Sequence, residues 1–205
     1  LPIYVEKNQW YLLDQGVMDD FEVLKNLSAG EINVASRTKD DSKWVVSFVT
    51  DDAPVKTYLY DRKTKKAKFL FVNRKALEGV KLAKMHPVTI KSRDGLNLVS
   101  YLTLPSHIAQ KPTKPLSTVL FVHGGPYARD QWGYNGVHQW LANRGYAVLS
   151  VNYRGSTGFG KGFLNASNHE WAGKMHDDLI DATDWLIKEG YSDPNKVAIM
   201  GGSYG

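Results

Sequence analysis

The 205-residue sequence predicts two architectures in succession: an all-β segment over residues 1–80 and a doubly wound, mostly parallel α/β sheet over residues 81–205. The first observation is a change of hydrophobic pattern near residue 80, from short alternating runs to continuous apolar runs. The second is that strand-like and helix-like runs then alternate up to the last residue. A hydrophobic content of 42% and an aromatic content of 12% indicate a globular chain.

Composition excludes several classes of site. Cysteine is absent, which rules out disulfides, thiolate metal sites and a cysteine nucleophile, but leaves the compartment open; we expect the cytoplasm rather than the periplasm or secretion. No apolar run approaches the ~18 residues of a membrane span. The net charge of +5 is spread out, with one dense basic cluster at Arg62–Lys66. No aromatic residues are interleaved with this cluster, so we expect a solvated turn and no nucleic-acid partner.

Residues 1–30 predict two short strands, Ile3–Val5 and Trp10–Leu13, around a turn at Asn8. Apolar residues at helical spacing then predict a short helix: Phe21, Leu24 and Leu27. We expect Asp19-Asp20 at the positive end of this helix, and Gly30 just past its other end.

Residues 31–72 predict four short strands separated by turn-forming residues: Ile32–Ser36, Trp44–Thr50, Val55–Tyr60 and Ala67–Val72. Four antiparallel strands in about 40 residues match the size of one β-propeller blade. A plain four-stranded meander in an α+β domain is the alternative. A lone blade cannot bury both faces or close a ring, so further blades would lie outside this chain.

Two alternating runs, Val88–Lys91 and Leu96–Leu104, flank an Asp-Gly turn and predict a β-hairpin. The continuous apolar runs Thr118–Val122 and Tyr146–Val151 predict strands buried on both faces. Between them we expect a helix over Trp132–Asn143, closed by a glycine.

A second helix is expected over Met175–Glu189, followed by a turn at Ser192–Asn195 and a buried strand at Val197–Met200. This strand runs into Gly201-Gly202-Ser203-Tyr204-Gly205, a G-x-S-x-G match. In that motif the serine occupies a sharp, strained turn, and the flanking glycines avoid clashes with neighbouring backbone. The turn would present the Ser203 hydroxyl to a base and a substrate carbonyl.

Ligands bind at the carboxyl ends of parallel strands, where this sequence places His123-Gly124-Gly125-Pro126 and Ser203. Acyl transfer at a serine requires backbone N–H groups that point at the developing oxyanion. One donor in this motif is the residue after the serine, here Tyr204, and the other comes from a glycine loop, here Gly125. The pairing of both motifs, each directly after a buried strand, is more specific than either alone.

These segments together resemble the prolyl oligopeptidase family of serine peptidases, most closely its acylaminoacyl-peptidase and dipeptidyl-peptidase-like branch. The matching segments are His123–Pro126, Asn152–Gly160, Asp177–Ala182 and Gly201–Gly205. The resemblance is dense over residues 88–205 and looser over 31–72. It implies a β-propeller joined to an α/β-hydrolase domain. Residues 1–80 would be about one blade, the last, and residues 81–205 the N-terminal half of the catalytic domain, ending at the nucleophile elbow.

The resemblance also implies roles. Ser203 would be the nucleophile, Gly125 and Tyr204 would supply oxyanion N–H groups, and the Tyr204 ring would line the S1 pocket. His123 and Gly124 would support the glycine loop. The triad order in this fold is Ser, Asp or Glu, then His, so the two partners are expected beyond residue 205. The chain alone would then be inactive, and the rest of the same protein would be its partner.

Other polar residues have structural interpretations. Arg154 could touch substrate, but we expect it to brace the glycine-rich loop behind it. Four aspartates are expected to serve helix-end electrostatics and a solvated face rather than a metal: Asp177, Asp178, Asp181 and Asp184. All six histidines precede Ser203, so none is assigned as the base. We expect no metal and no organic cofactor.

The leading hypothesis is a serine peptidase that hydrolyses short peptides through an acyl-enzyme on Ser203. An esterase acting on non-peptide acyl groups is the second. A non-catalytic propeller and hydrolase fragment with an interaction role is the third. Specificity at P1, exo- against endopeptidase action and oligomeric state stay open, and an oligomer is possible.

Overall fold

The computed structural model describes residues 2–205, with the side chains described from residue 5 on. The chain divides into two compact units, residues 1–81 and 82–205, which are described separately. Among the described residues, none of the helices combines the length and apolar character that a bilayer crossing requires.

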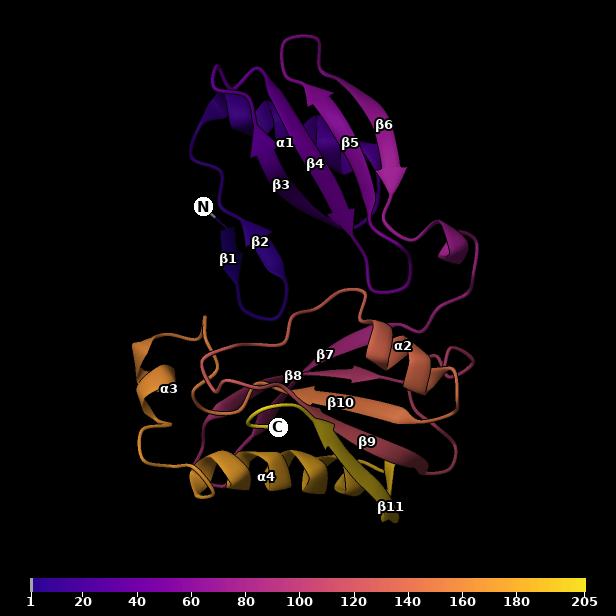
Figure 1. The fold of residues 1–205 in the computed structure, drawn as a ribbon, viewed down its shortest axis with the longest axis vertical. Helices are drawn as coiled ribbons and strands as arrows, with labels where there is room; N and C mark the ends of the chain where they lie inside the picture. The colour runs from indigo at the N-terminus through magenta and orange to yellow at the C-terminus, as the bar shows by residue number, and fades with distance from the viewer. Residues whose placement is uncertain (1) are drawn as a thin grey trace. The chain divides into compact units, whose positions relative to one another are not determined.

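The first unit holds a four-stranded antiparallel sheet in the order β3-β4-β5-β6 (Figure 1). Its strands are β3 (Glu31–Arg37), β4 (Lys43–Val49), β5 (Lys56–Asp61) and β6 (Lys66–Val72). Before them come a two-stranded ribbon, β1 (Pro2–Tyr4) and β2 (Asn8–Trp10), and the helix α1 (Gln15–Leu27). A single 3₁₀ turn, η1 (Lys75–Leu77), follows β6. These four strands agree with the four short strands predicted over residues 31–72.

The core of this unit forms where α1 covers one face of the sheet. Period-2 alternation along β4 buries Trp44, Val46 and Phe48 on that face. Phe21 of α1 contacts Trp44 edge-to-face, with ring centroids 6.3 Å apart. The helix is therefore held by burial of its apolar stripe.

The helix α1 begins earlier than expected, and its acids play another part. Asp14 is the N-cap, accepting a hydrogen bond from Val17 N at 3.0 Å, and the first turn holds no acidic residue. Asp20 instead lies inside the helix and is fully buried. The prediction that Asp19-Asp20 marks the positive helix end was wrong, because aspartate at a cap and aspartate in an ion pair look alike in sequence.

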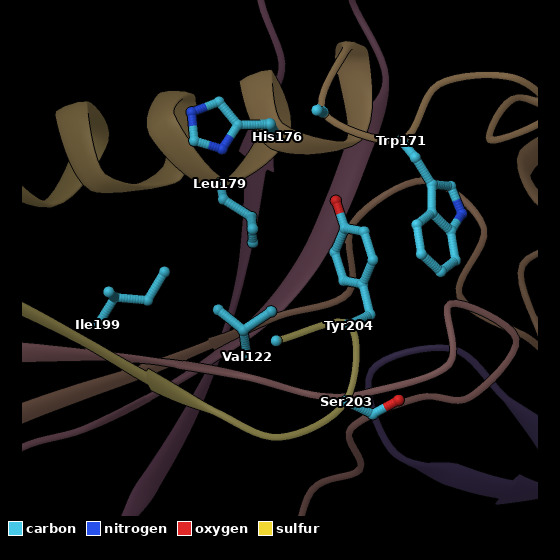
Figure 2. A pocket seen from close by; sticks show the side chains of 9 residues that line it. Val122, Trp171, His176, Leu179, Ile199, Ser203 and Tyr204 are labelled. Carbon is cyan, nitrogen blue, oxygen red and sulfur yellow. The ribbon is translucent and has the colours of Figure 1, made fainter.

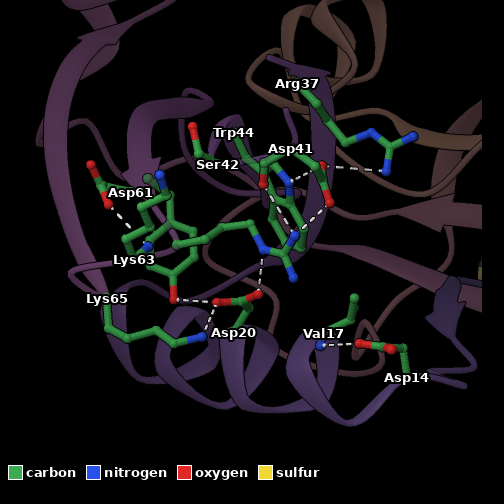
Figure 3. A network of polar contacts seen from close by, with 12 residues as sticks. Asp14, Val17, Asp20, Arg37, Asp41, Ser42, Trp44, Asp61, Lys63 and Lys65 are labelled. Atoms are coloured by element: carbon green, nitrogen blue, oxygen red, sulfur yellow. Dashed lines mark hydrogen bonds and ion pairs between the residues drawn. The ribbon is translucent and has the colours of Figure 1, made fainter. Parts of the chain in front are cut away.

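The basic turn Arg62–Lys66 is not simply solvated. Arg62 Nε donates to Asp20 Oδ2 at 2.6 Å, Lys65 pairs with Asp20 Oδ1, and the Tyr60 hydroxyl donates to the same oxygen at 2.9 Å (Figure 3). Burial alone would raise the pKa of Asp20, but these three donors outweigh it and lower that pKa. Two cations of the β5–β6 turn thus fasten the helix to the sheet.

The second unit holds a five-stranded mixed sheet in the order β11-β9-β10-β8-β7. An antiparallel hairpin, β7 (Met85–Lys91) and β8 (Asn97–Thr103), leads to β9 (Leu116–Val122), β10 (Ala147–Val151) and β11 (Ser192–Gly201). The last three strands run parallel to one another, with β9 in the middle, while β8 is antiparallel to β10. The expected order of strands and helices is therefore present.

Helices cover both faces of this sheet. The helix α2 (Gly136–Ala142) lies on one face and α4 (Lys174–Lys188) on the other (Figure 1). Along β9, Val119 packs with α2, whereas Leu120 and Val122 join the cluster that includes α4. A strand buried on both faces explains why its sequence is continuously apolar.

Three details of this unit differ from the expectations. The helix α2 is shorter than Trp132–Asn143, because Asn135 caps it by accepting from Val137 N and His138 N, and Trp132 lies in the preceding loop. A five-residue helix, α3 (Lys161–Asn165), was not expected. The turn expected at Ser192–Asn195 lies within β11, whose register with β9 shifts between Ser192 and Val197.

The strand β11 runs parallel to β9, as expected for a parallel sheet, but the run Val197–Met200 is not buried as predicted. Within the part of the chain that the structure describes, β11 is one of the two edge strands of the sheet, and Val197, Ile199 and Met200 are 37%, 65% and 41% exposed. An apolar run predicts that a strand tends to be buried, but it does not predict which element packs against that strand.

Candidate active site

The turn after β11 has the geometry that places a serine side chain clear of the backbone. Ser203 has a φ of 59°, a left-handed conformation that costs a non-glycine residue about 1–2 kcal/mol. A Cβ on Gly201 would lie 2.5 Å from Gly205 C, and one on Gly205 would lie 2.2 Å from Val122 O. The chain therefore closes tightly on itself at Gly201 and against β9 at Gly205, and the Ser203 side chain projects from the turn between them.

The glycine loop after β9 lies against this turn. A Cβ on Gly124 would be 2.9 Å from Gly202 O and 3.0 Å from Ser203 Cβ. Gly125 has a φ of 129°, and a Cβ there would be 2.6 Å from Tyr127 N. Both glycines are thus required for close approach or conformation. The fold brings together two segments nearly 80 residues apart in the sequence.

His123 is tied into the loop rather than directed at Ser203. Its Nδ1 lies 2.8 Å from Gly124 O; because a carbonyl only accepts, Nδ1 carries the proton in this contact. Its Nε2 lies 2.9 Å from Ser156 Oγ. Burial lowers the pKa of His123, so the neutral ring is favoured.

Tyr204, the residue after the serine, lies between two aromatic rings. Its ring stacks on Tyr153, with centroids 5.0 Å apart and planes at 28°, and Trp171 meets it edge-on at 5.4 Å. Figure 2 shows the Tyr204 ring rising toward α4, with the Ser203 side chain directed away from it. The two neighbouring side chains therefore project to different sides of the turn.

A pocket of about 570 Å³ opens beside this turn (Figure 2). It is mainly apolar, and its walls come from the end of β9, the start of α4, β11 and the turn itself. The lining residues are Val122, Trp171, Ala172, His176, Leu179, Ile199, Ser203, Tyr204 and Gly205.

The remaining histidines are not joined to the serine. Within residues 2–205, which the structure describes, no histidine nitrogen is hydrogen-bonded to Ser203. His138 is fully buried, with Nδ1 2.9 Å from Thr103 Oγ1 and Nε2 2.8 Å from Ser150 Oγ. Burial lowers the pKa of His138 to about 3. It is a core residue that links α2 to β8 and β10.

Nor does the described part of the chain gather a metal site: no group of three histidine or acidic residues is placed to hold an ion there.

Known proteins with similar sequences and folds were found for this chain. Residues 132–205 match the model of the prolyl oligopeptidase family. Dipeptidyl aminopeptidase BIII of Pseudoxanthomonas mexicana is 52% identical over 203 residues, which cover 97% of this chain and 30% of that protein. The chain belongs to the prolyl oligopeptidase family.

Two further proteins are similar to this chain, one in sequence and one in a solved structure. Dipeptidyl peptidase family member 6 of Caenorhabditis elegans is 37% identical, again over 97% of this chain and 30% of that protein. A solved puromycin-hydrolyzing peptidase of Mycobacterium tuberculosis superposes with a TM-score of 0.69 at 27% identity, covering 79% of this chain and 25% of its own. The chain thus spans about a third of the length of the prolyl oligopeptidase family members that it matches.

In this member of the prolyl oligopeptidase family, Arg154 lies in the loop after β10 and is buried. Its Nε and Nη2 donate to Asp178 at 2.9 and 2.7 Å, and its Nη1 and Nη2 donate to Asp94 at 2.9 and 2.8 Å. Hydrogen bonds from Arg154 and Ser92 hold the pKa of Asp94 well below its usual range, while burial raises that of Asp178. Arg154 thus joins the loop after β10 to α4 and to the turn between β7 and β8.

The solvated-face interpretation of the α4 aspartates was wrong for Asp178. Asp178 is fully buried, and Asp181 accepts from Arg93 N at 2.7 Å and Arg93 Nε at 2.9 Å. Asp178 falls between Met175 and Ala182 at helical spacing, on the apolar stripe itself. That position was a usable signal, because a carboxylate on a buried stripe needs a cationic partner.

Sequence reasoning also missed two groups near the glycine loop. Asn152 fixes the main chain of Asp130, donating to its O at 3.2 Å and accepting from its N at 2.8 Å. The Asp130 Oδ2 atom is buried without a hydrogen-bond partner. Burial raises the pKa of Asp130 to about 7, although Arg129 opposes the shift. No local sequence pattern predicts the buried position of Asp130, because the segment that contains it is held by Asn152, which follows a different strand.

Proposed function

We propose that this chain is the part of a serine peptidase that carries the nucleophile, and that the whole protein hydrolyses short peptides. The approach of the Gly124-Gly125 loop to the Ser203 turn carries the proposal. Acyl transfer requires a serine beside backbone N–H groups, and this approach supports a site at the carboxyl ends of β9 and β11 where Gly125 and Tyr204 would supply them. Membership of the prolyl oligopeptidase family supports the reaction class.

The proposed chemistry proceeds in two halves. Ser203 Oγ bonds to the scissile carbonyl carbon while its proton passes to a histidine, and the N–H groups of Gly125 and Tyr204 stabilise the resulting oxyanion. Collapse breaks the C–N bond, and the leaving amine takes that proton. Water then hydrolyses the Ser203 ester by the same route, regenerating the serine.

The histidine and its acid partner are proposed to lie in the rest of the protein, because the triad order of this fold places both after the serine. On this proposal, residues 81–205 are the N-terminal half of an α/β-hydrolase domain. Residues 1–80 are about one blade of a β-propeller that restricts entry to small substrates. The relatives' names favour dipeptides or acylated amino acids as the released group.

Covalent labelling tests the proposal. The full-length protein is incubated with a fluorophosphonate probe and its intact mass is measured, with Ser203→Ala as the matched control. We expect one probe on the wild type and none on the variant. Labelling of both proteins, or of neither, would contradict a nucleophilic Ser203.

The esterase alternative makes a different prediction. Hydrolysis of a dipeptidyl or acylaminoacyl anilide, abolished by Ser203→Ala, supports a peptidase. Turnover of p-nitrophenyl esters alone supports an esterase. An unlabelled, inactive full-length protein would favour an interaction role.

A further inference from the structure

Tyr153 joins the two segments that the proposed reaction uses. It stands two residues after β10 and is completely buried. One face of its ring stacks on His123, with centroids 4.6 Å apart and planes at 18°. It also stacks on Tyr204, at 5.0 Å and 28°. His123 directly precedes the glycine loop and Tyr204 directly follows the serine, so a single ring contacts both.

The Tyr153 hydroxyl adds a directional contact. It donates a hydrogen bond to His123 O at 2.8 Å. That carbonyl belongs to the peptide bond that leads into Gly124, so the contact sets the orientation of the peptide at the start of the loop. Burial raises the pKa of Tyr153, and nearby Tyr204 and Asp130 raise it further, so the hydroxyl stays protonated as a donor.

The backbone that carries this ring is itself held on both sides. Asn152 N donates to Val99 O of β8 at 3.1 Å, and Arg154 N donates to Asp178 Oδ2 of α4 at 2.8 Å. Tyr153 O accepts from Ser156 N at 3.0 Å and lies 2.7 Å from Ser156 Oγ. These hydrogen bonds hold the backbone from which the Tyr153 side chain projects.

We infer that Tyr153 is a positioning residue that sets the spacing between the two oxyanion donors, the N–H groups of Gly125 and Tyr204. This inference rests on the proposed function. The donors must lie about 2.7–3.1 Å from the oxyanion, so a small relative shift of the two segments weakens both hydrogen bonds. The N–H groups sit within two residues of the two rings that Tyr153 contacts.

Two variants of the full-length protein separate the contributions of ring and hydroxyl. Tyr153→Phe keeps the stack and loses the hydrogen bond to His123 O. Tyr153→Leu loses both. Tyr60→Phe is the matched control, because it removes another buried tyrosine hydroxyl, bonded to Asp20 in the first unit. The assays are kcat and KM for a dipeptidyl anilide, thermal unfolding, and the affinities for a peptide aldehyde and for the product dipeptide.

We expect Tyr153→Phe to lower kcat about 10-fold, and Tyr153→Leu about 100-fold, with KM within about 2-fold of wild type, since loss of one whole oxyanion donor costs about 10²–10³ in kcat. Affinity for the aldehyde, whose adduct carries an oxyanion, should fall by the same factors, while product affinity is retained. Tyr60→Phe should lower the unfolding temperature without changing kcat. A merely structural role of Tyr153 would move stability but not the aldehyde-to-product affinity ratio.

An active wild type with unchanged kcat and aldehyde affinity in Tyr153→Phe would overturn this inference and leave the proposed function standing. A raised KM at constant kcat would overturn it too, because Tyr153 would then act on substrate binding. If Tyr153→Leu fails to fold, Tyr153→Phe alone decides. A wild type that neither takes the fluorophosphonate nor turns over the anilide would overturn the proposed function, and the inference with it.

Discussion

Arg154 and Asp178 form a bidentate pair inside the second unit, joining the loop after β10 to the N-terminal half of α4. Nε lies 2.9 Å from Oδ2 and Nη2 lies 2.7 Å from Oδ1, and the two side chains are 3% and 0% exposed. The backbone N–H of Arg154 donates to the same carboxylate. The planar guanidinium fits this geometry, and a lysine ammonium could not reproduce it.

Removal of one partner leaves the other charge buried. We expect Asp178→Asn and Arg154→Lys each to destabilise the second unit by about 3 kcal/mol, near the lower end for a broken buried pair, because Asp94 still reaches Arg154 from a half-exposed position. Hydrogen exchange of the α4 amides measures this loss. Lys196→Gln, which removes an exposed pair with Asp193, is the control and should cost under about 1 kcal/mol. If the Arg154 and Asp178 variants lost no more stability than Lys196→Gln, the pair between Arg154 and Asp178 would not stabilise the second unit.

The contact between the glycine loop and the elbow can be tested with two alanines. Gly124→Ala would place a Cβ 2.9 Å from Gly202 O, so the loop must shift away from Ser203. We expect kcat/KM to fall about 100-fold, comparable to the loss of an oxyanion donor. Gly202→Ala is the control, since a Cβ there meets nothing within 4 Å and should leave activity near wild type. A tolerated Gly124→Ala would contradict the close approach.

Asp130 predicts a pH dependence of stability. Its pKa is raised to about 7 in the folded protein from 3.8, so the folded state holds this proton more tightly than the unfolded state. Stability therefore falls as pH rises from about 4 to about 7, where the buried carboxylate becomes charged. Asp130→Asn should remove this dependence, becoming progressively more stable than wild type over that range and gaining about 2–4 kcal/mol by pH 7. Thermal unfolding at a series of pH values, with Asp193→Asn as an exposed control, measures it; parallel curves for wild type and Asp130→Asn would refute it.

Asp20 predicts the opposite pH dependence in the first unit. Its lowered pKa means that the carboxylate stabilises the fold above the unfolded value of 3.8, and that this contribution is lost as pH falls through the folded pKa. Asp20→Asn should lower the exchange protection of the α1 amides at pH 7 by about 2 kcal/mol, since Arg62 and Lys65 are partly exposed and can rehydrate. The difference from wild type should shrink in acid. A constant difference at every pH would assign the effect to packing.

The strands and the turn that depend on local sequence pattern could be predicted. The contacts between side chains that lie far apart in the sequence could not. Thr118–Val122 and Tyr146–Val151 lie within or overlap β9 and β10 because a strand buried on both faces must be apolar throughout. The Ser203 turn followed from glycines that no other residue can replace. By contrast, the roles of Asp20, Tyr153 and Asp178 depend on contacts with residues 24 to 51 positions away. The spacing of residues along one helix or strand does not predict such contacts. Asp178 is the exception, because its position on the buried stripe of α4 indicates that it needs a partner.

The exposed position of β11 has a practical consequence. One edge of this strand pairs with β9, the other edge is unpaired within the described residues, and its apolar side chains, Ile199 above all, are exposed. A long apolar strand at a rim is a ready template for pairing with another molecule. Material made from these 205 residues alone would therefore self-associate through this rim. Aggregation through β11 would then remove such material from solution, whereas the full-length protein could cover this strand.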